Sequence, residues 1–304
     1  MNKYRFYHFL FFLEKALSKL NTLLSRKVES FMYKKIRKRL ISYFKIAEHN
    51  LHEADEISGK IVWVLWWQGF DNAPEIVKAC VNSVINNYDG KVVLVNKYNV
   101  KKYTDISDDI YDKLESGYIT KTHFSDIVRF NILKNYGGLW IDSTILCTKK
   151  FEHSMFSTFY TSKGKEDSYP YFMKGKWTGF LIGGRKNDPT FQFMDEFFKV
   201  YWSENLHLIN YFLIDYALMY AYERNIGGLS TYVDNEAINN NPKLFELSNL
   251  LNSIFDKENY NKLIKDTDFF KLTYKKKFKK GNGTFYDFLI SCDNKINFKK
   301  LNRY

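Results

Sequence analysis

The sequence is poor in residues that break regular structure. It has 4 prolines among 304 residues, and neither proline nor glycine occurs before Gly59. This absence favours long helices at the N-terminal end. No run of about 18 apolar residues is present, so we expect no transmembrane helix. The apolar stretch 7–13 lacks a following small-residue cleavage site, so it does not fit a secretory signal.

Cysteine is equally scarce. Cys80, Cys147 and Cys292 lie far apart in the sequence, and their number is odd. This pattern argues against a disulfide framework and against a zinc site. Isolated reduced thiols are typical of the cytosol, so we expect a cytoplasmic protein.

Aromatic and basic side chains are abundant instead. The chain is 45% hydrophobic and 18% aromatic, which is enough for a sizeable core. Its net charge is +12, yet residues 1–50 alone carry twelve Lys or Arg against three Asp or Glu, a net of +9. The basic character therefore belongs mainly to the N-terminal segment.

Apolar residues at helical spacing predict helix over residues 4–50. Cationic side chains surround Ile36, Leu40 and Phe44 there. Such a helix suits an anionic membrane surface, so we expect peripheral binding at the inner face of the cell membrane. The alternative is a helix docked on its own domain with solvated lysines outside. We expect no nucleic-acid partner, because no nucleic-acid-binding motif accompanies the charge.

Strand and helix patterns alternate after a polar break at residues 52–60. Strands are predicted at 61–67, 91–96, 139–142 and 178–184, and helices at 74–88, 122–138, 189–202 and 206–224. Connections of this length argue for an α/β fold with a largely parallel sheet. We therefore divide the chain into a basic helical region, residues 1–55, and an α/β domain, residues 56–304.

Polar residues follow the predicted strands, at the edge where ligands of open α/β sheets bind. Trp67 and Gln68 end the first strand, and Asp142 ends the third. A carboxylate at this edge can accept sugar hydroxyls or bind a divalent cation. Asp126 and Arg129 lie three apart on a predicted helix and share a face. The alternative for this pair is an ion pair with no further function.

Two stretches resemble a known family. SDIVRFNILKNYGGLWIDST, residues 125–144, resembles the S-D-x-x-R-x-x-x-L-x-x-x-G-G-x-x-x-D-x-[DT] signature of GT-A sugar-nucleotide glycosyltransferases. WVLWWQGFDNAPEIVKACVNSV, residues 63–84, is similar to the first strand and helix of the capsular polysaccharide synthesis family. Glycosyltransferases with a DXD motif and the large clostridial glucosylating toxins share this core. The resemblance covers roughly residues 60–290, and the motifs are specific when taken together.

The resemblance implies a fold, an activity and a place for each residue. The fold is the Rossmann-like GT-A fold, and the activity is hexosyl transfer with retention of the anomeric configuration. Trp67 would stack against the nucleobase, with Gln68 beside it in the donor site. Asp126 would bind the ribose or the donor sugar, and Arg129 the sugar hydroxyls or the phosphate side. Asp142 would touch sugar and ribose and lie beside the metal.

One position departs from the family pattern. Thr144 stands where the second acid of the D-x-D motif usually chelates the metal. A hydroxyl is a far weaker ligand for Mn²⁺ or Mg²⁺ than a carboxylate. Either Asp142 carries the ion with water and the diphosphate, or lysines replace it. We therefore expect weak or absent dependence on a divalent cation.

Two further residues complete the predicted site. Cleavage of the anomeric C–O bond leaves a nucleoside diphosphate, whose charge must be stabilised. Lys271 resembles the lysine of a K-L-[ST] element in these enzymes and would supply a cation. The lysines of residues 275–280 would do the same or form a solvated run. Asp215, inside an apolar helix, would act in catalysis on the acceptor side or pair with a neighbouring Lys or Tyr.

The sequence therefore predicts a glycosyltransferase. We expect it to move a hexose from a nucleotide sugar, with UDP as the nucleotide, onto a lipid-linked oligosaccharide in capsular or surface polysaccharide synthesis. One alternative is a toxin-like transferase that glycosylates protein. Another is a non-catalytic adaptor at the membrane surface with a degenerate transferase fold, which Thr144 would permit.

Overall fold

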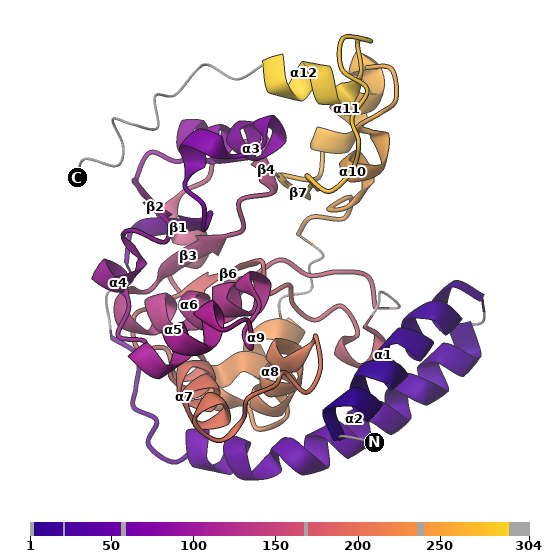
Figure 1. The fold of residues 1–304 in the computed structure, drawn as a ribbon. Coiled ribbons are helices and arrows are strands. Elements are labelled where there is room, and N and C mark those ends of the chain that lie inside the picture. The colour runs from indigo at the N-terminus through magenta and orange to yellow at the C-terminus, as the bar shows by residue number, and fades with distance from the viewer. Residues whose placement is uncertain (1–2, 21, 56–58, 167–169, 236–239, 292–304) are drawn as a thin grey trace.

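Alternating strands and helices build the chain, as the sequence predicts (Figure 1). The computed structural model describes residues 3–20, 22–55, 59–166, 170–235 and 240–291. The strands are β1 (Ile61–Leu65), β2 (Lys91–Val95), β3 (Gly138–Ile141), β4 (Ile145–Cys147), β5 (Tyr160–Thr161), β6 (Leu181–Gly184) and β7 (Phe269–Lys271). The helices are α1 (Lys3–Leu20), α2 (Thr22–Ala47), α3 (Glu75–Asn87), α4 (Val100–Tyr103), α5 (Asp108–Glu115), α6 (Lys121–Tyr136), α7 (Pro189–Glu204), α8 (Leu213–Glu223), α9 (Leu229–Asn235), α10 (Glu246–Leu250), α11 (Lys257–Ile264) and α12 (Phe285–Ser291).

A mixed sheet of order β2-β1-β3-β6-β5 forms the centre of the molecule. β1 pairs in parallel with β2 and with β3, so these three strands end at the same edge. β6 pairs antiparallel with β3, and β5 pairs antiparallel with β6. The parallel part is Rossmann-like, and its carboxyl edge is where ligands of such sheets bind. The fourth predicted strand, β6, runs against the other three.

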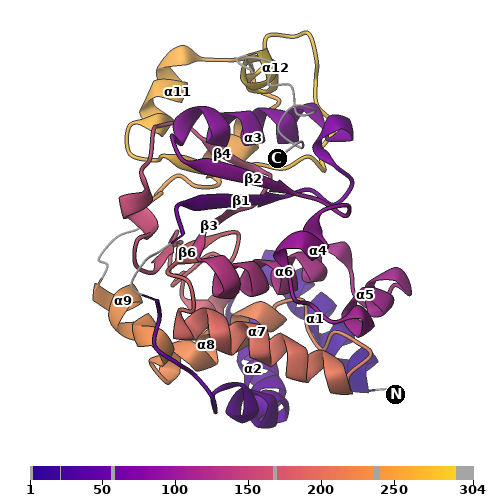
Figure 2. The ribbon, with the colours of Figure 1, turned by 90° about the vertical axis from the view of Figure 1, so that its left-hand side faces the viewer.

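Both faces of the sheet are covered by helices (Figure 2). Along β1, Val62 and Val64 join the core shared with α3, whereas Trp63 joins the core shared with α6, α7 and α8. This alternation follows from the two-residue period of a strand. β1 and β3 are apolar at every position and mostly buried, as expected for strands covered on both faces.

A glycine pair turns the chain from α6 into β3. Gly137 and Gly138 have φ values of 64° and 98°, which residues with a side chain rarely adopt. A Cβ atom at Gly137 would lie 2.5 Å from the backbone nitrogen of Lys186, and one at Gly138 would lie 2.3 Å from the carbonyl oxygen of Ile61. The pair therefore brings α6 and β3 close together, which fixes the spacing of the site residues that each carries.

The N-terminal helices α1 and α2 lie side by side, and α2 runs along the helical layer of α7 and α8 (Figure 1). The apolar side chains at one face of α2 are buried in the same core as α7 and α8: Met32, Ile36, Leu40, Phe44 and Ala47. The Phe44 ring stacks on Tyr220, with 4.7 Å between ring centroids, and tilts against Phe197 at 5.1 Å. Through this face α2 is docked on its own domain, which was the alternative to membrane binding in the sequence analysis.

Most predicted elements form, with two revisions at the C-terminal side. The predicted helix at 206–224 begins only at Leu213, and residues 205–212 are irregular. The short sheet of β4 and β7 was not predicted; it pairs Ile145 with Lys271. The basic stretch after β7 is a loop that ends in α12, a short helix. Cys80 and Cys147 are buried free thiols, and Cys292 lies outside the described residues.

Within the described ranges, no helix is both long and apolar enough to cross a membrane.

Removing the buried face of α2 should destabilise the whole protein. We expect Phe44→Ala to lower the free energy of unfolding by about 3–5 kcal/mol, because it leaves a cavity against α7 and α8. Ile46→Ala on the same helix is the matched control, since Ile46 is 50% exposed. Urea unfolding measures both. A chain without residues 1–55 should fail to fold, and a stable truncated protein would show that α2 is dispensable.

Candidate active site

A cleft with a volume of about 580 Å³ opens at the carboxyl edge of β1 and β3. This volume is in the range that binds small molecules. The cleft contains every site residue that the sequence predicts, although they come from five different parts of the chain: Trp67, Gln68, Asp126, Arg129, Asp142, Thr144, Asp215 and Lys271. The fold therefore brings the predicted residues to one place.

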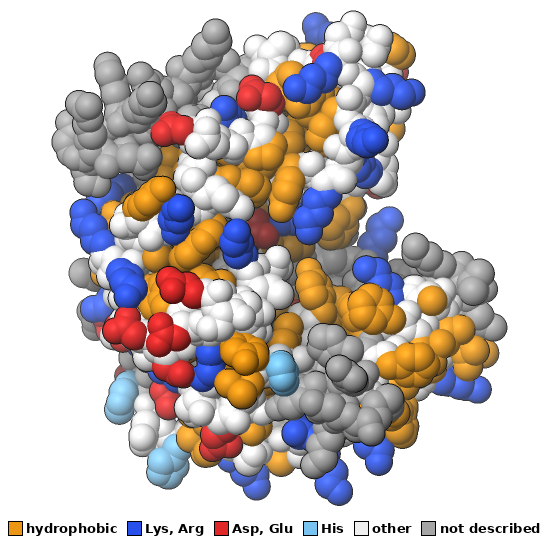
Figure 3. All heavy atoms as spheres, in the orientation of Figure 1, with side chains coloured by type: hydrophobic (Ala, Val, Ile, Leu, Met, Phe, Trp, Pro, Cys, Tyr) orange, Lys and Arg blue, Asp and Glu red, His pale blue; other side chains and the backbone are white. Residues whose placement is uncertain are grey.

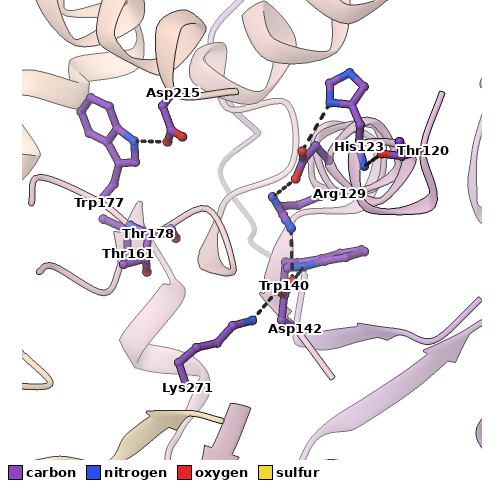
Figure 4. Close-up of polar contacts among 11 residues, drawn as sticks. Thr120, His123, Arg129, Trp140, Asp142, Thr161, Trp177, Thr178, Asp215 and Lys271 are labelled. Atoms are coloured by element: carbon purple, nitrogen blue, oxygen red, sulfur yellow. Dashed lines mark hydrogen bonds and ion pairs between the residues drawn. The ribbon is translucent and has the colours of Figure 1, made fainter. Parts of the chain in front are cut away.

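The carboxylate of Asp142 lies at the centre of the polar contacts (Figure 4). Lys271 at the end of β7 places Nζ 2.7 Å from Oδ2 of Asp142. Arg129 on α6 donates from Nη2 to Oδ1 at 3.1 Å, and the indole nitrogen of Trp140 donates to the same oxygen at 2.9 Å. Asp142 thus links α6 and the end of β3, which are neighbours in the sequence, to β7, which lies 129 residues further along the chain.

Electrostatics keep Asp142 ionised. Its burial would raise the pKa, but the charges of Lys271 and Arg129 and the hydrogen bonds from Lys271 and Trp140 outweigh that effect. The pKa of Asp142 therefore lies below its usual value. Aromatic rings orient both cations: Lys271 Nζ lies 4.6 Å from the centroid of the Phe180 ring, and the Arg129 guanidinium carbon lies 5.2 Å from that of Trp140.

Three residues at three-residue spacing on α6 form a chain of polar contacts. Arg129 donates from Nη1 to Asp126 Oδ1 at 2.8 Å, so the intrahelical pair does form. The other carboxylate oxygen of Asp126 faces Nδ1 of His123 at 3.5 Å. The indole of Trp202 donates to Nε2 of His123 at 3.0 Å. Arg129 therefore binds both Asp126 and Asp142, and the ion pair is part of the cleft.

The aromatic end of β1 forms another wall of the cleft. Trp67 is half-buried, with its ring edge against Phe124 at 5.2 Å, and Gln68 beside it is exposed. Trp66 also lines the cleft and packs edge-on against Tyr274 of the loop after β7. A planar base can therefore be received between aromatic side chains here.

Asp215 on α8 lies across the cleft from Asp142 (Figure 4). Its Oδ1 accepts a hydrogen bond from the indole nitrogen of Trp177 at 3.1 Å, rather than pairing with a Lys or Tyr. Burial raises the pKa of Asp215 to about 7, and the negative charge of Asp126 adds to this effect. The cleft thus has one carboxyl group held ionised and another that titrates near neutral pH.

Gly179 keeps the two sides of the cleft at close range. A Cβ atom there would lie 2.7 Å from Cδ1 of Ile214 and 3.2 Å from Nη1 of Arg129. A larger residue would therefore displace the guanidinium. Next to it, the hydroxyl of Thr178 is buried and lacks a hydrogen-bond partner among the described residues. Other atoms of Thr178 line the cleft.

The basic loop after β7 contributes one lysine to the cleft, Lys275. The remaining lysines, Lys276, Lys277, Lys279 and Lys280, are exposed and do not line it. The alternative of a solvated lysine run therefore describes these four. Lys271, by contrast, is partly covered and bound to Asp142.

The donor set does not fit a resident divalent cation. Both oxygens of Asp142 already accept hydrogen bonds from cationic or N–H donors, and Thr144 offers only a hydroxyl. Mn²⁺ and Mg²⁺ require several oxygen ligands at close range. The part of the chain that the structure describes contains no group of three or more His, Cys, Asp or Glu side chains that could hold a metal. Lys271 lies where a cation would neutralise Asp142.

Several residues that line the cleft or contact its side chains were not among the predicted site residues. Trp140 shares a strand face with Asp142 because the two are two residues apart, and that spacing was an available signal. His123 precedes Asp126 by one helical turn and was equally visible. Trp177 and Tyr211 come from segments that are irregular in the structure, and Tyr211 lies in a stretch that the sequence predicts as helix, so only the folded chain places both at the cleft.

Comparison with known proteins identifies the family. Residues 11–289 match the family described as capsular polysaccharide synthesis protein. A curated protein of Acanthamoeba polyphaga mimivirus, named as an uncharacterized glycosyltransferase, is 24% identical over 137 residues, which is 44% of this chain and 53% of that protein. The chain thus spans about half the length of the curated relative. Because the family match covers most of the sequence, the chain belongs to the capsular polysaccharide synthesis protein family.

Proposed function

We propose that the protein is a glycosyltransferase of the GT-A type that moves a hexose from a nucleotide sugar to an acceptor hydroxyl. One observation carries this proposal: two cations, Lys271 and Arg129, meet at Asp142 in a cleft at the carboxyl edge of parallel strands. That edge is the ligand site of open α/β sheets. The family and the glycosyltransferase name of the mimivirus protein support the same chemistry.

The donor would lie along the cation side of the cleft. Trp67 would face the nucleobase, which we propose to be uracil, with Gln68 at the rim. Asp126 and Asp142 would accept hydrogen bonds from ribose and sugar hydroxyls. Lys271 and Arg129 would bind the diphosphate, since both are positioned by aromatic rings and by Asp142. Preorganised cations of this kind stabilise charge that develops on a leaving group.

The reaction exchanges one C–O bond for another. The bond between the anomeric carbon and the diphosphate breaks, and both electrons leave with the nucleoside diphosphate. A new bond forms from the acceptor oxygen to the anomeric carbon, and the hydroxyl proton passes to the Asp215 carboxylate. A base with a pKa near 7 suits that step at neutral pH. Retention of the anomeric configuration stays a prediction that rests on the resemblance.

We further propose that the acceptor is a lipid-linked oligosaccharide in capsular or surface polysaccharide synthesis. Such an acceptor is confined to a membrane. The protein would act at the inner face of the cell membrane as a peripheral enzyme. The family description names capsular polysaccharide synthesis, and this is the support for the acceptor class.

Donor hydrolysis in water tests the proposed activity. The protein should slowly release UDP from a UDP-hexose, and Asp142→Asn should reduce that rate about 100-fold or more because both cations lose their anchor. Asp108→Asn is the matched control, since Asp108 on α5 is exposed and forms an ion pair with Lys101 on α4. Calorimetry with UDP, GDP and CMP donors accompanies the assay. Absence of binding across this panel would support the non-catalytic adaptor instead.

Metal dependence tests the function of Lys271. We expect EDTA to leave UDP binding and UDP release unchanged, because an ammonium group stands in for the cation. Lys271→Met should weaken UDP binding by about tenfold to 100-fold through loss of one charge-assisted contact. Thr144→Asp should increase the affinity for Mn²⁺, measured by calorimetry without donor. Loss of all activity in EDTA, restored by micromolar Mn²⁺, would contradict this proposal.

The pH dependence of stability tests the environment of Asp215. Its pKa is raised to about 7 in the folded protein, whereas an unfolded Asp titrates near pH ~4. Between about pH 4 and pH 7 the folded protein keeps the Asp215 proton, whereas the unfolded chain has lost it. The free energy of unfolding therefore falls as the pH rises through this interval. Asp215→Asn should therefore raise the free energy of unfolding at about pH 8 by roughly 4 kcal/mol, with no gain near pH 4.

Urea unfolding at both pH values measures this difference, with Asp108→Asn as the control for an exposed carboxyl group. An Asp215→Asn effect that is the same at both pH values would mean that the native carboxyl does not titrate in this window. The variant should keep UDP binding and lose hexosyl transfer.

A further inference from the structure

The outer faces of α1 and α2 expose an unusual amount of apolar surface. On α1, Phe9, Phe12 and Leu13 are 58%, 66% and 38% exposed. On α2, Leu23 and Phe31 are 68% and 47% exposed. Single exposed apolar residues are normal, but a cluster of this kind marks an interaction site. Figure 3 shows hydrophobic side chains gathered over the part of the surface that α1 and α2 form.

This surface is separate from the face that holds the helices on the domain. On α1, Tyr7, Leu10 and Phe11 point to the protein, and the exposed phenylalanines and leucine lie on the other side of the helix. On α2, the buried face of Ile36 and Leu40 points away from the side that carries Leu23 and Phe31, since a helix has 3.6 residues per turn. The folded domain therefore leaves the outer apolar face exposed to solvent.

Basic side chains share the outer face of α2. Exposed lysines fall on the same side of the helix as Phe31: Lys27, Lys34, Lys35 and Lys38. Lys35 also lies over the Phe31 ring at 5.6 Å. None of the exposed positions described between residues 23 and 38 is acidic, because the acid of this stretch, Glu29, is buried and accepts a hydrogen bond from the backbone of Tyr171. The surface thus combines exposed aromatic and aliphatic groups with a positive charge.

We propose that this outer face of α1 and α2 docks on an anionic lipid bilayer. Apolar side chains enter the acyl boundary, and the lysines meet anionic headgroups. A second copy of the chain would instead bring the same lysines together, which is unfavourable. Docking on a bilayer would place the enzyme at its lipid-linked acceptor, so the biological purpose of this surface rests on the proposed function.

The position of α1 links this surface to the cleft. The Phe11 ring stacks on Tyr211 with 6.0 Å between centroids and meets Phe212 edge-on at 5.8 Å. Tyr211 and Phe212 both line the cleft on the side of Asp215. A bilayer that contacts the outer face of α1 therefore lies one helix away from the end of the cleft that would receive the acceptor. A sugar on a lipid anchor can reach that end without leaving the membrane surface.

Vesicle sedimentation with the full chain tests the proposal. We expect binding to phosphatidylcholine vesicles that contain phosphatidylglycerol, weaker binding to phosphatidylcholine alone, and release by salt. The triple variant Phe9→Gln, Phe12→Gln, Leu13→Gln should lower the affinity at least about tenfold. The variant Lys34→Gln, Lys35→Gln, Lys38→Gln should remove the preference for phosphatidylglycerol. All of these side chains except Leu13 are well exposed, so melting temperatures should stay close to that of the wild type.

The matched control is Tyr98→Gln with Ile254→Gln, two residues that are 80% and 71% exposed outside α1 and α2. It should bind vesicles as the wild type does. Equal vesicle binding by the α1 triple variant and the wild type would overturn the inference. A wild-type dimer in analytical ultracentrifugation that becomes a monomer in the triple variant would also overturn it. UDP release from a UDP-hexose in solution distinguishes the proposed transferase activity from the proposed docking. The rate of release should be the same in every variant. If no protein released UDP, the proposed function would be refuted and the docking proposal would not be affected.

Discussion

The contact of Asp142 with Arg129 and Lys271 sets the geometry of the cleft. Arg129 comes from α6 and Lys271 from β7, so the carboxylate joins segments that are 13 and 129 residues away. An ion pair in a partly covered cleft is weak support for stability, because desolvation offsets much of its attraction. Its physical consequence is a fixed position for two cations. The short antiparallel sheet of β4 and β7 places Lys271 beside the end of β3.

Two carboxyl groups of the cleft, Asp142 and Asp215, have opposite pKa shifts. Cations and N–H donors surround Asp142 and lower its pKa, while Asp215 is buried with one indole donor and its pKa rises to about 7. The same loss of water acts on both residues, and the difference comes from the charges that face them. This contrast agrees with the proposed function, in which Lys271 and Arg129 bind an anionic donor and Asp215 accepts a proton from a hydroxyl. Gly179 preserves it by leaving room for the Arg129 guanidinium.

Helix α2 has two faces in different environments, and the composition of the N-terminal segment alone does not distinguish them. One face of α2 buries Ile36, Leu40 and Phe44 in the domain core, and the opposite face carries lysines and exposed apolar groups. The helix is therefore part of the fold, and its exposed face is the surface that we propose docks on a bilayer. The family match begins at residue 11, which agrees with α2 as part of the common domain.

The sequence by itself determined the order of elements, the parallel centre of the sheet and the residues at its carboxyl edge. Periodicity fixes the buried face of α3, and Trp67 and Asp142 lie at the ends of predicted strands whatever packs around them. Only the tertiary structure decided which face of α2 is covered, because an amphipathic pattern does not name its partner. It alone decided that Lys271 forms an ion pair with Asp142. Contacts across 129 residues depend on packing that no local pattern encodes.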